Sequence, residues 1–189
     1  GAPNRKDQDQ FSQEFQFLGD VGQFQYLAGL YYFEEEADEV TREQTPFLFG
    51  GFGTQRTYNA QNSAWAGFGQ LTYTPSAFDD KLDITLGLRY TEDKREINIS
   101  EVVNGRPATG DFDESFENIS GSLVFDYAFN MDMNGYFRIA TGYKAGGFLH
   151  RTSIANQRPF DAETLTSYEI GLKSQWLENR VRLNGAVFY

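Results

Sequence analysis

Cysteine is absent from this chain of 189 residues, which excludes a disulfide framework and any metal site built on thiolates. The sequence also contains no apolar run of roughly 18 residues, the length that a transmembrane helix requires. A basic excess is missing too, because the net charge is -11, and this argues against nucleic-acid binding. No charged segment followed by an apolar one opens the chain, so we expect a mature, trimmed or excised polypeptide.

Aromatic residues and glycine are abundant. Aromatics make up 16% of the chain, with 18 Phe and 11 Tyr, a content that suits aromatic girdles at a membrane boundary. The 19 glycines and 5 prolines fit a β protein rich in turns. The mean hydropathy of -0.54 is low, but a transmembrane barrel places its apolar residues at alternate positions, so this average does not exclude one.

Apolar and polar residues alternate one by one in the segment 82–91. Leu82, Ile84 and Leu86 share one face of a strand, whereas Asp83 and Thr85 share the other. The pattern recurs in paired segments joined by short links that contain Gly, Pro, Asn or Asp. The predicted pairs are 11–18 with 24–33, 64–74 with 81–99, 117–128 with 135–148, and 164–176 with 180–189.

The opposite ends of these hairpins carry long connections, predicted at 34–63, 100–116 and 149–163. Short turns at one edge and long loops at the other are typical of an outer-membrane barrel. The predicted fold class is therefore all-β, with about eight antiparallel transmembrane β-barrel strands in four hairpins.

The alternation also predicts which residues face lipid. Charged residues fall on the inward face, where water or protein solvates them, because Arg or Lys facing lipid costs roughly 2–4 kcal/mol at the midplane. The expected lipid-facing residues after position 120 are Leu123, Phe125, Tyr127, Phe137, Ile139, Thr141, Tyr143, Tyr168, Ile170, Leu172, Trp176, Val181, Leu183, Val187 and Tyr189.

The last fifty residues resemble TonB-dependent outer-membrane receptors of the siderophore-receptor type. Gly142–Phe148 reads GYKAGGF and resembles their GYKxGGF segment. Phe160–Lys173 resembles their F-x-P-E-x-x-x-x-Y-E-x-G-x-K stretch, with Ala162 in place of the proline, and Asn179–Tyr189 resembles the strand that follows. The resemblance implies that residues 1–189 are part of a plugged barrel of roughly 22 strands. The plug domain and the remaining strands are absent from this sequence.

The resemblance also implies a function. Such receptors lie in the outer membrane of Gram-negative bacteria and import a scarce ligand, with energy that TonB delivers through the plug. The implied partners are a ferric siderophore or another small ligand, the TonB complex through the absent plug, and outer-membrane lipid and lipopolysaccharide. Cobalamin, haem and oligosaccharides are also ligands of the family, and the sequence does not select among them.

The candidate ligand-binding residues, in a loop or in the lumen, are Tyr143, Lys144, Phe148, His150 and Arg151. We predict no catalytic residue, cofactor or metal site, because no second carboxylate accompanies Glu169 and no second ligand accompanies His150.

Other features of the chain allow two interpretations. Lys144, Glu169 and Lys173 could touch the ligand or the plug, but a solvated charge network on the lumenal face is the preferred interpretation. The acidic run Glu34–Glu39 is interpreted as a solvated loop top, with ligand selection or cation bridging at the lipopolysaccharide surface as alternatives. The apolar patch Phe47–Gly53 is interpreted as the core of a folded loop, or as a contact with a hydrophobic ligand.

Two other architectures remain open at this point. One is a complete small barrel of eight strands with a structural or adhesive role. The other is a soluble β-sandwich that binds carbohydrate through Tyr and Trp. Eight strands cut from a larger barrel would leave two unpaired edges, so we expect this chain not to close a stable pore alone.

Overall fold

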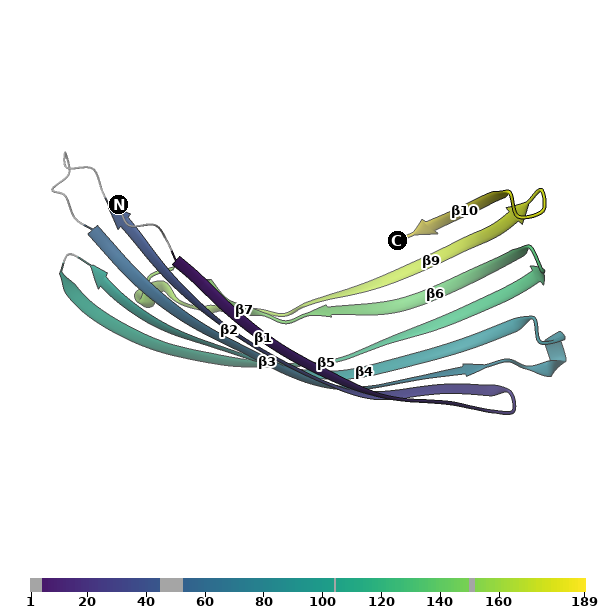
Figure 1. Ribbon diagram of the computed structural model, residues 1–189, viewed down its shortest axis with the longest axis horizontal. Helices are drawn as coiled ribbons and strands as arrows, with labels where there is room; N and C mark the ends of the chain where they lie inside the picture. The colour runs from purple at the N-terminus through teal and green to yellow at the C-terminus, as the bar shows by residue number, and fades with distance from the viewer. Residues whose placement is uncertain (1–4, 45–52, 104, 150–151) are drawn as a thin grey trace.

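The computed structural model describes residues 5–44, 53–103, 105–149 and 152–189, with the side chains of residues 43, 44 and 53 also left aside (Figure 1). Its strands are β1 Arg5–Val21, β2 Phe24–Gln44, β3 Gly53–Tyr73, β4 Leu82–Val103, β5 Arg106–Asn130, β6 Met133–Lys144, β7 Gly147–Phe148, β8 Pro159–Phe160, β9 Glu163–Trp176 and β10 Val181–Phe188. Two single 3-10 turns, η2 Ser76–Phe78 and η3 Ile154–Asn156, complete the secondary structure of the described residues. None of the helical segments in these ranges is long and apolar enough to cross a membrane.

Eight strands form one antiparallel sheet in the order β1-β2-β3-β4-β5-β6-β9-β10, which confirms the eight strands predicted from the alternation. The sheet curls into a trough, with the links β1–β2, β3–β4, β5–β6 and β9–β10 together at one end (Figure 1). A single curled sheet is not a sandwich. Over the described residues β1 and β10 do not pair with each other, so the sheet is open and is not a complete barrel of eight strands.

The strands run much farther than the hydrophobic pattern predicted. Pairing of β2 with β3 continues to Gln44 and Gly53, and pairing of β4 with β5 continues to Val103 and Arg106. Most of the connections predicted at 34–63 and 100–116 is therefore strand, and the acidic run Glu34–Glu39 lies inside β2. Crossing a bilayer takes only roughly 9–11 residues. Beyond that length the backbone hydrogen bonds between the strands continue, but nothing requires apolar and polar residues to alternate.

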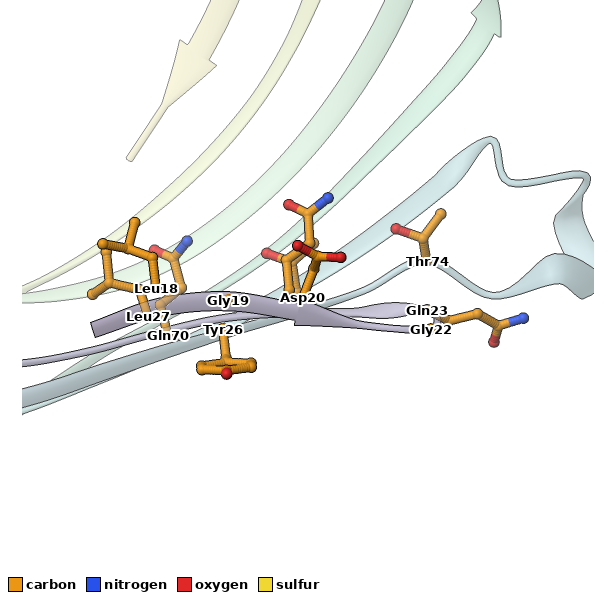
Figure 2. A pocket seen from close by; sticks show the side chains of 11 residues that line it. Leu18, Gly19, Asp20, Gly22, Gln23, Tyr26, Leu27, Gln70 and Thr74 are labelled. Atoms are coloured by element: carbon orange, nitrogen blue, oxygen red, sulfur yellow. The ribbon is translucent and has the colours of Figure 1, made fainter. Parts of the chain in front are cut away.

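The two faces of the sheet differ in character, as Figure 2 shows at the short-turn end of β1–β3. Leu18, Asp20 and Thr74 point to the concave side, and Tyr26 points to the convex side. The concave side here is a hollow of about 570 Å³ lined partly by Gln25, Gln70 and Thr72. We call the concave side the inner face and the convex side the outer face.

The outer face carries a continuous apolar band. One row of paired residues crosses all eight strands of the sheet and is apolar or aromatic throughout: Val21, Phe24, Tyr73, Ile84, Phe125, Phe137, Ile170 and Val187. Toward the long connections the band ends at aromatic side chains that meet carboxylates. The Trp65 indole N–H donates to Glu92 at 3.0 Å, and the Tyr32 hydroxyl donates to Glu34 at 3.1 Å. These residues mark the polar boundary of the band.

Candidate functional site

Past that boundary the polarity of the two faces is reversed. On β4, Lys94, Glu96 and Asn98 lie on the outer face, whereas Ile97 and Ile99 lie on the inner face with only 1% and 2% of their surface exposed. These two side chains form a cluster with Tyr58 and Phe148, and Phe112 and Ile154 pack against it. Apolar residues on an inner face need a cover, because the rest of this face is polar and open.

The cover is the docked segment, which we define as residues 145–149 and 152–160. It includes the small hairpin in which Gly147 pairs with Phe160 and Phe148 pairs with Pro159. Phe148 is 8% exposed, and its ring centroid lies 6.2 Å from that of Phe112 on the wall. The sequence pattern missed this hairpin, because 135–148 reads as one uninterrupted strand.

Gly146 makes the close approach of the docked segment possible. A Cβ atom at this position would overlap the carbonyl oxygen of Phe160 and lie 2.6 Å from the ring of Phe116. By contrast, a Cβ at Gly142, in the same sequence motif, would make an ordinary contact of 3.9 Å with Leu165. The glycines of GYKAGGF therefore differ in role, and Gly146 is the one that packing requires.

Two ion pairs lie on the same part of the inner wall. An Arg95 guanidinium nitrogen lies 2.8 Å from the Asp93 carboxylate, and Arg56 Nε lies 3.1 Å from that of Glu101. The side chains of Asp93 and Glu101 are each 10% exposed. Neither pair was predicted. The sequence contained one signal that could have been used. After Glu92 the apolar residues of β4 change from even to odd positions, which indicates that the inner face is covered there.

Tyr143 lies at the end of β6, past the apolar band, and its hydroxyl is buried. Burial, together with the nearby negative charge of Asp93, raises the pKa of Tyr143 to about 12. The expectation that Tyr143 faces lipid is therefore wrong. Pairing of β6 with β5 ends at Ala140 and Ser122, and beyond this point β6 pairs only with β9, as far as Lys144 and Glu163.

The structure separates the candidate ligand-binding residues. Tyr143 and Phe148 pack against the inner wall, and Lys144 between them is exposed. His150 and Arg151 lie outside the described residues, as does most of the apolar patch predicted at 47–53. In the described ranges, no group of three or more His, Cys, Asp or Glu side chains could hold a metal ion.

Glu169 and Lys173 meet through Tyr136 on the inner face. The Tyr136 hydroxyl donates to the Glu169 carboxylate, and the Lys173 ammonium lies 5.0 Å from the centre of the Tyr136 ring. The ring lies over Gly171, where a Cβ would clash with it. These contacts join β6 to β9, and they agree with the interpretation of Glu169 and Lys173 as a lumenal charge network.

Replacing Arg95 with Gln should destabilise the docked segment by about 3 kcal/mol, because Asp93 would remain buried without its counter-ion. The double variant Asp93→Asn, Arg95→Gln should recover most of this loss, since no buried charge remains. Hydrogen exchange of residues 145–160 in the two variants measures both effects. Equal losses in the single and double variants would show that the ion pair is not what matters.

The sequence matches the family described as TonB dependent receptor-like, beta-barrel, over residues 2–189, and the chain belongs to this family. The curated relatives it matches include the pesticin receptors of Yersinia enterocolitica (serotype O:8 / biotype 1B) and Yersinia pestis, each 28% identical over 198 residues and 99% of this chain. The chain spans 27% of the length of the Yersinia enterocolitica relative.

Solved structures share the fold. The ferric yersiniabactin uptake receptor FyuA from Yersinia pestis superimposes with a TM-score of 0.85 at 23% identity, over 98% of this chain and 28% of that chain. The siderophore receptor PiuA from Acinetobacter baumannii superimposes with a TM-score of 0.76 at 17% identity, over 98% of this chain and 32% of that chain. The curled sheet thus corresponds to part of a TonB-dependent receptor barrel.

Proposed function

We propose that this chain forms part of the barrel wall of an outer-membrane receptor that actively imports a scarce ligand, a ferric siderophore. The observation that carries the proposal is the membership of residues 2–189 in the TonB-dependent receptor family. The names of the pesticin receptors and of the ferric yersiniabactin uptake receptor support a siderophore as the first ligand to test. The apolar outer band supports a location in the bacterial outer membrane.

The proposal includes parts of the protein beyond residues 1–189. A complete receptor would add the remaining barrel strands and a plug, through which the TonB complex would act. The wall would contribute its lumenal lining and the connections at one mouth of the barrel, and it would perform no catalysis. Of the candidate ligand-binding residues that the structure describes, Lys144 is exposed next to the docked segment and is the best placed to reach a ligand at that mouth.

Uptake by the complete protein tests this function. Cells that lack their own siderophore receptors should gain uptake of a radioactive ferric siderophore when they express the complete receptor. The same cells without TonB should not, because transport through a plugged barrel needs energy. A panel of ferric siderophores, haem and cobalamin would identify the ligand. Uptake that persists without TonB would contradict the proposal, as would failure of the whole panel in correctly inserted receptor.

A further inference from the structure

The inner face carries a second hollow, at mid-strand and separate from the docked segment. It has a volume of about 350 Å³ and is lined by residues of β2, β3, β4, β5 and β6. Its polar lining consists of Gln70, Arg89, Ser120, Ser122, Arg138 and Thr141, and it contains no carboxylate. Thr141, which the sequence predicted to face lipid, accepts a hydrogen bond from the Gly121 backbone N–H at 2.8 Å through its hydroxyl. The chain as a whole has a net charge of -11, so a hollow lined by two arginines and no acidic residue differs in charge from the rest of the molecule.

Arg89 is held in place from several sides. Its guanidinium carbon lies 5.3 Å from the ring centre of Tyr31 and 5.5 Å from that of Phe68, and its Nε donates to the Thr91 hydroxyl at 3.1 Å. The aromatic rings hold the guanidinium by cation–π attraction, and Thr91 fixes its orientation. The two terminal nitrogens, which form the fork that binds planar anions, have no described carboxylate partner.

Arg138 approaches the hollow from β6. Its cross-strand neighbour on β9 is Glu169, but that carboxylate accepts the Tyr136 hydroxyl and does not line the hollow. Among the described side chains, no salt bridge includes Arg89 or Arg138. The register places Arg89 opposite Ser120 and Arg138 opposite Val124, with Ser122 between them on β5. The arginines therefore lie at the two ends of a hollow whose middle offers a hydroxyl.

We infer that this hollow, bounded by Arg89 and Arg138, is a binding site for carboxylate groups on the inner wall. Both arginines line the hollow and no carboxylate does, so an anion that enters it meets positive charge at either end and hydroxyl groups between. A planar carboxylate fits the free fork of Arg89, and a ligand with several carboxylates can reach both arginines. The inference depends on the proposed function in one respect: the inner face must line a barrel lumen that contains a ligand or another part of the receptor.

The carboxylate can come from a free ligand or from the receptor's own chain outside residues 1–189. Citrate binding and melting temperature of the complete receptor in detergent distinguish these two sources. If the carboxylate comes from a free ligand, we expect citrate to bind and the substitutions Arg138→Gln and Arg89→Lys each to weaken this binding at least tenfold. The melting temperature without citrate does not change.

If the carboxylate belongs to the receptor itself, we expect citrate not to bind. Arg138→Gln should then lower the melting temperature, and Arg138→Lys should lower it less. Arg106→Gln is the control, because Arg106 is exposed at the turn between β4 and β5, far along both strands from the hollow. Arg138 is itself exposed, so its replacement should not prevent folding.

The inference is overturned if citrate does not bind and the melting temperatures of the Arg138→Gln and Arg89→Lys variants equal that of the Arg106→Gln control. It is also overturned if citrate binds equally to all of these proteins, because the binding site would then lie elsewhere. Uptake of the ferric siderophore is measured separately in cells. Failure of that uptake overturns the proposed function without changing the result for citrate.

Discussion

Replacing Gly146 with Ala should release the docked segment from the inner wall. The new methyl group would overlap the backbone carbonyl of Phe160 and press on the ring of Phe116, and a backbone atom cannot rotate away as a side chain can. We expect a loss of about 2 kcal/mol in the local stability of residues 145–160, which corresponds to roughly 30-fold faster hydrogen exchange. Hydrogen exchange by mass spectrometry on the complete receptor measures this change.

Gly142→Ala is the matched control, because the new methyl would meet only Leu165 at 3.9 Å. Both positions belong to the same seven-residue motif. A difference between the two variants must therefore come from packing and not from a general effect of changing the motif. We expect Gly142→Ala to leave exchange of the docked segment unchanged. Equal effects of the two substitutions would contradict the steric role assigned to Gly146.

Placing an arginine at Leu86 should prevent assembly of the receptor in the membrane. Leu86 lies on the outer face of β4, where it pairs with Leu71 and Leu123 inside the apolar band. In the proposed outer-membrane location a guanidinium there would face lipid, at a cost of roughly 2–4 kcal/mol near the midplane. The amount of heat-modifiable, folded receptor in outer-membrane fractions should fall severalfold.

Thr85→Arg provides the control from the adjacent position. Thr85 lies on the inner face, where its hydroxyl is 2.8 Å from that of Thr72, and an arginine there can remain in water or contact polar groups. We expect this variant to assemble in nearly normal amounts. Normal assembly of Leu86→Arg, or an equal defect in both variants, would show that the outer face of β4 is not exposed to lipid.

Between Leu82 and Tyr90 the sequence predicted the structure closely, because side chains there alternate between the outer and the inner face of the sheet and the period of two is a direct consequence. The predicted end of β2 and start of β5 were wrong. Beyond the band β2 carries polar residues on both faces, as at Glu34–Glu39. On β5 the apolar side chain of Phe112 lies on the inner face, against the sense of the band. Backbone hydrogen bonds hold a strand together regardless of that pattern. The sequence shows that Ile97 and Ile99 are apolar. It does not show that they lie on the inner face, which is explained only by the docked segment that covers them.

The sequence alone determined the all-β class, the number of main strands, the short turns and the family to which the chain belongs. These properties depend on local periodicity and on contiguous motifs such as Gly142–Phe148. Only the tertiary structure decided that Phe148 and Tyr143 pack on the inner wall, that Gly146 must lack a side chain, and that Arg89 and Arg138 share one hollow. Each of these depends on contacts between segments far apart in the chain. Such contacts are set by strand register and by the path of the docked segment, which no short-range pattern encodes.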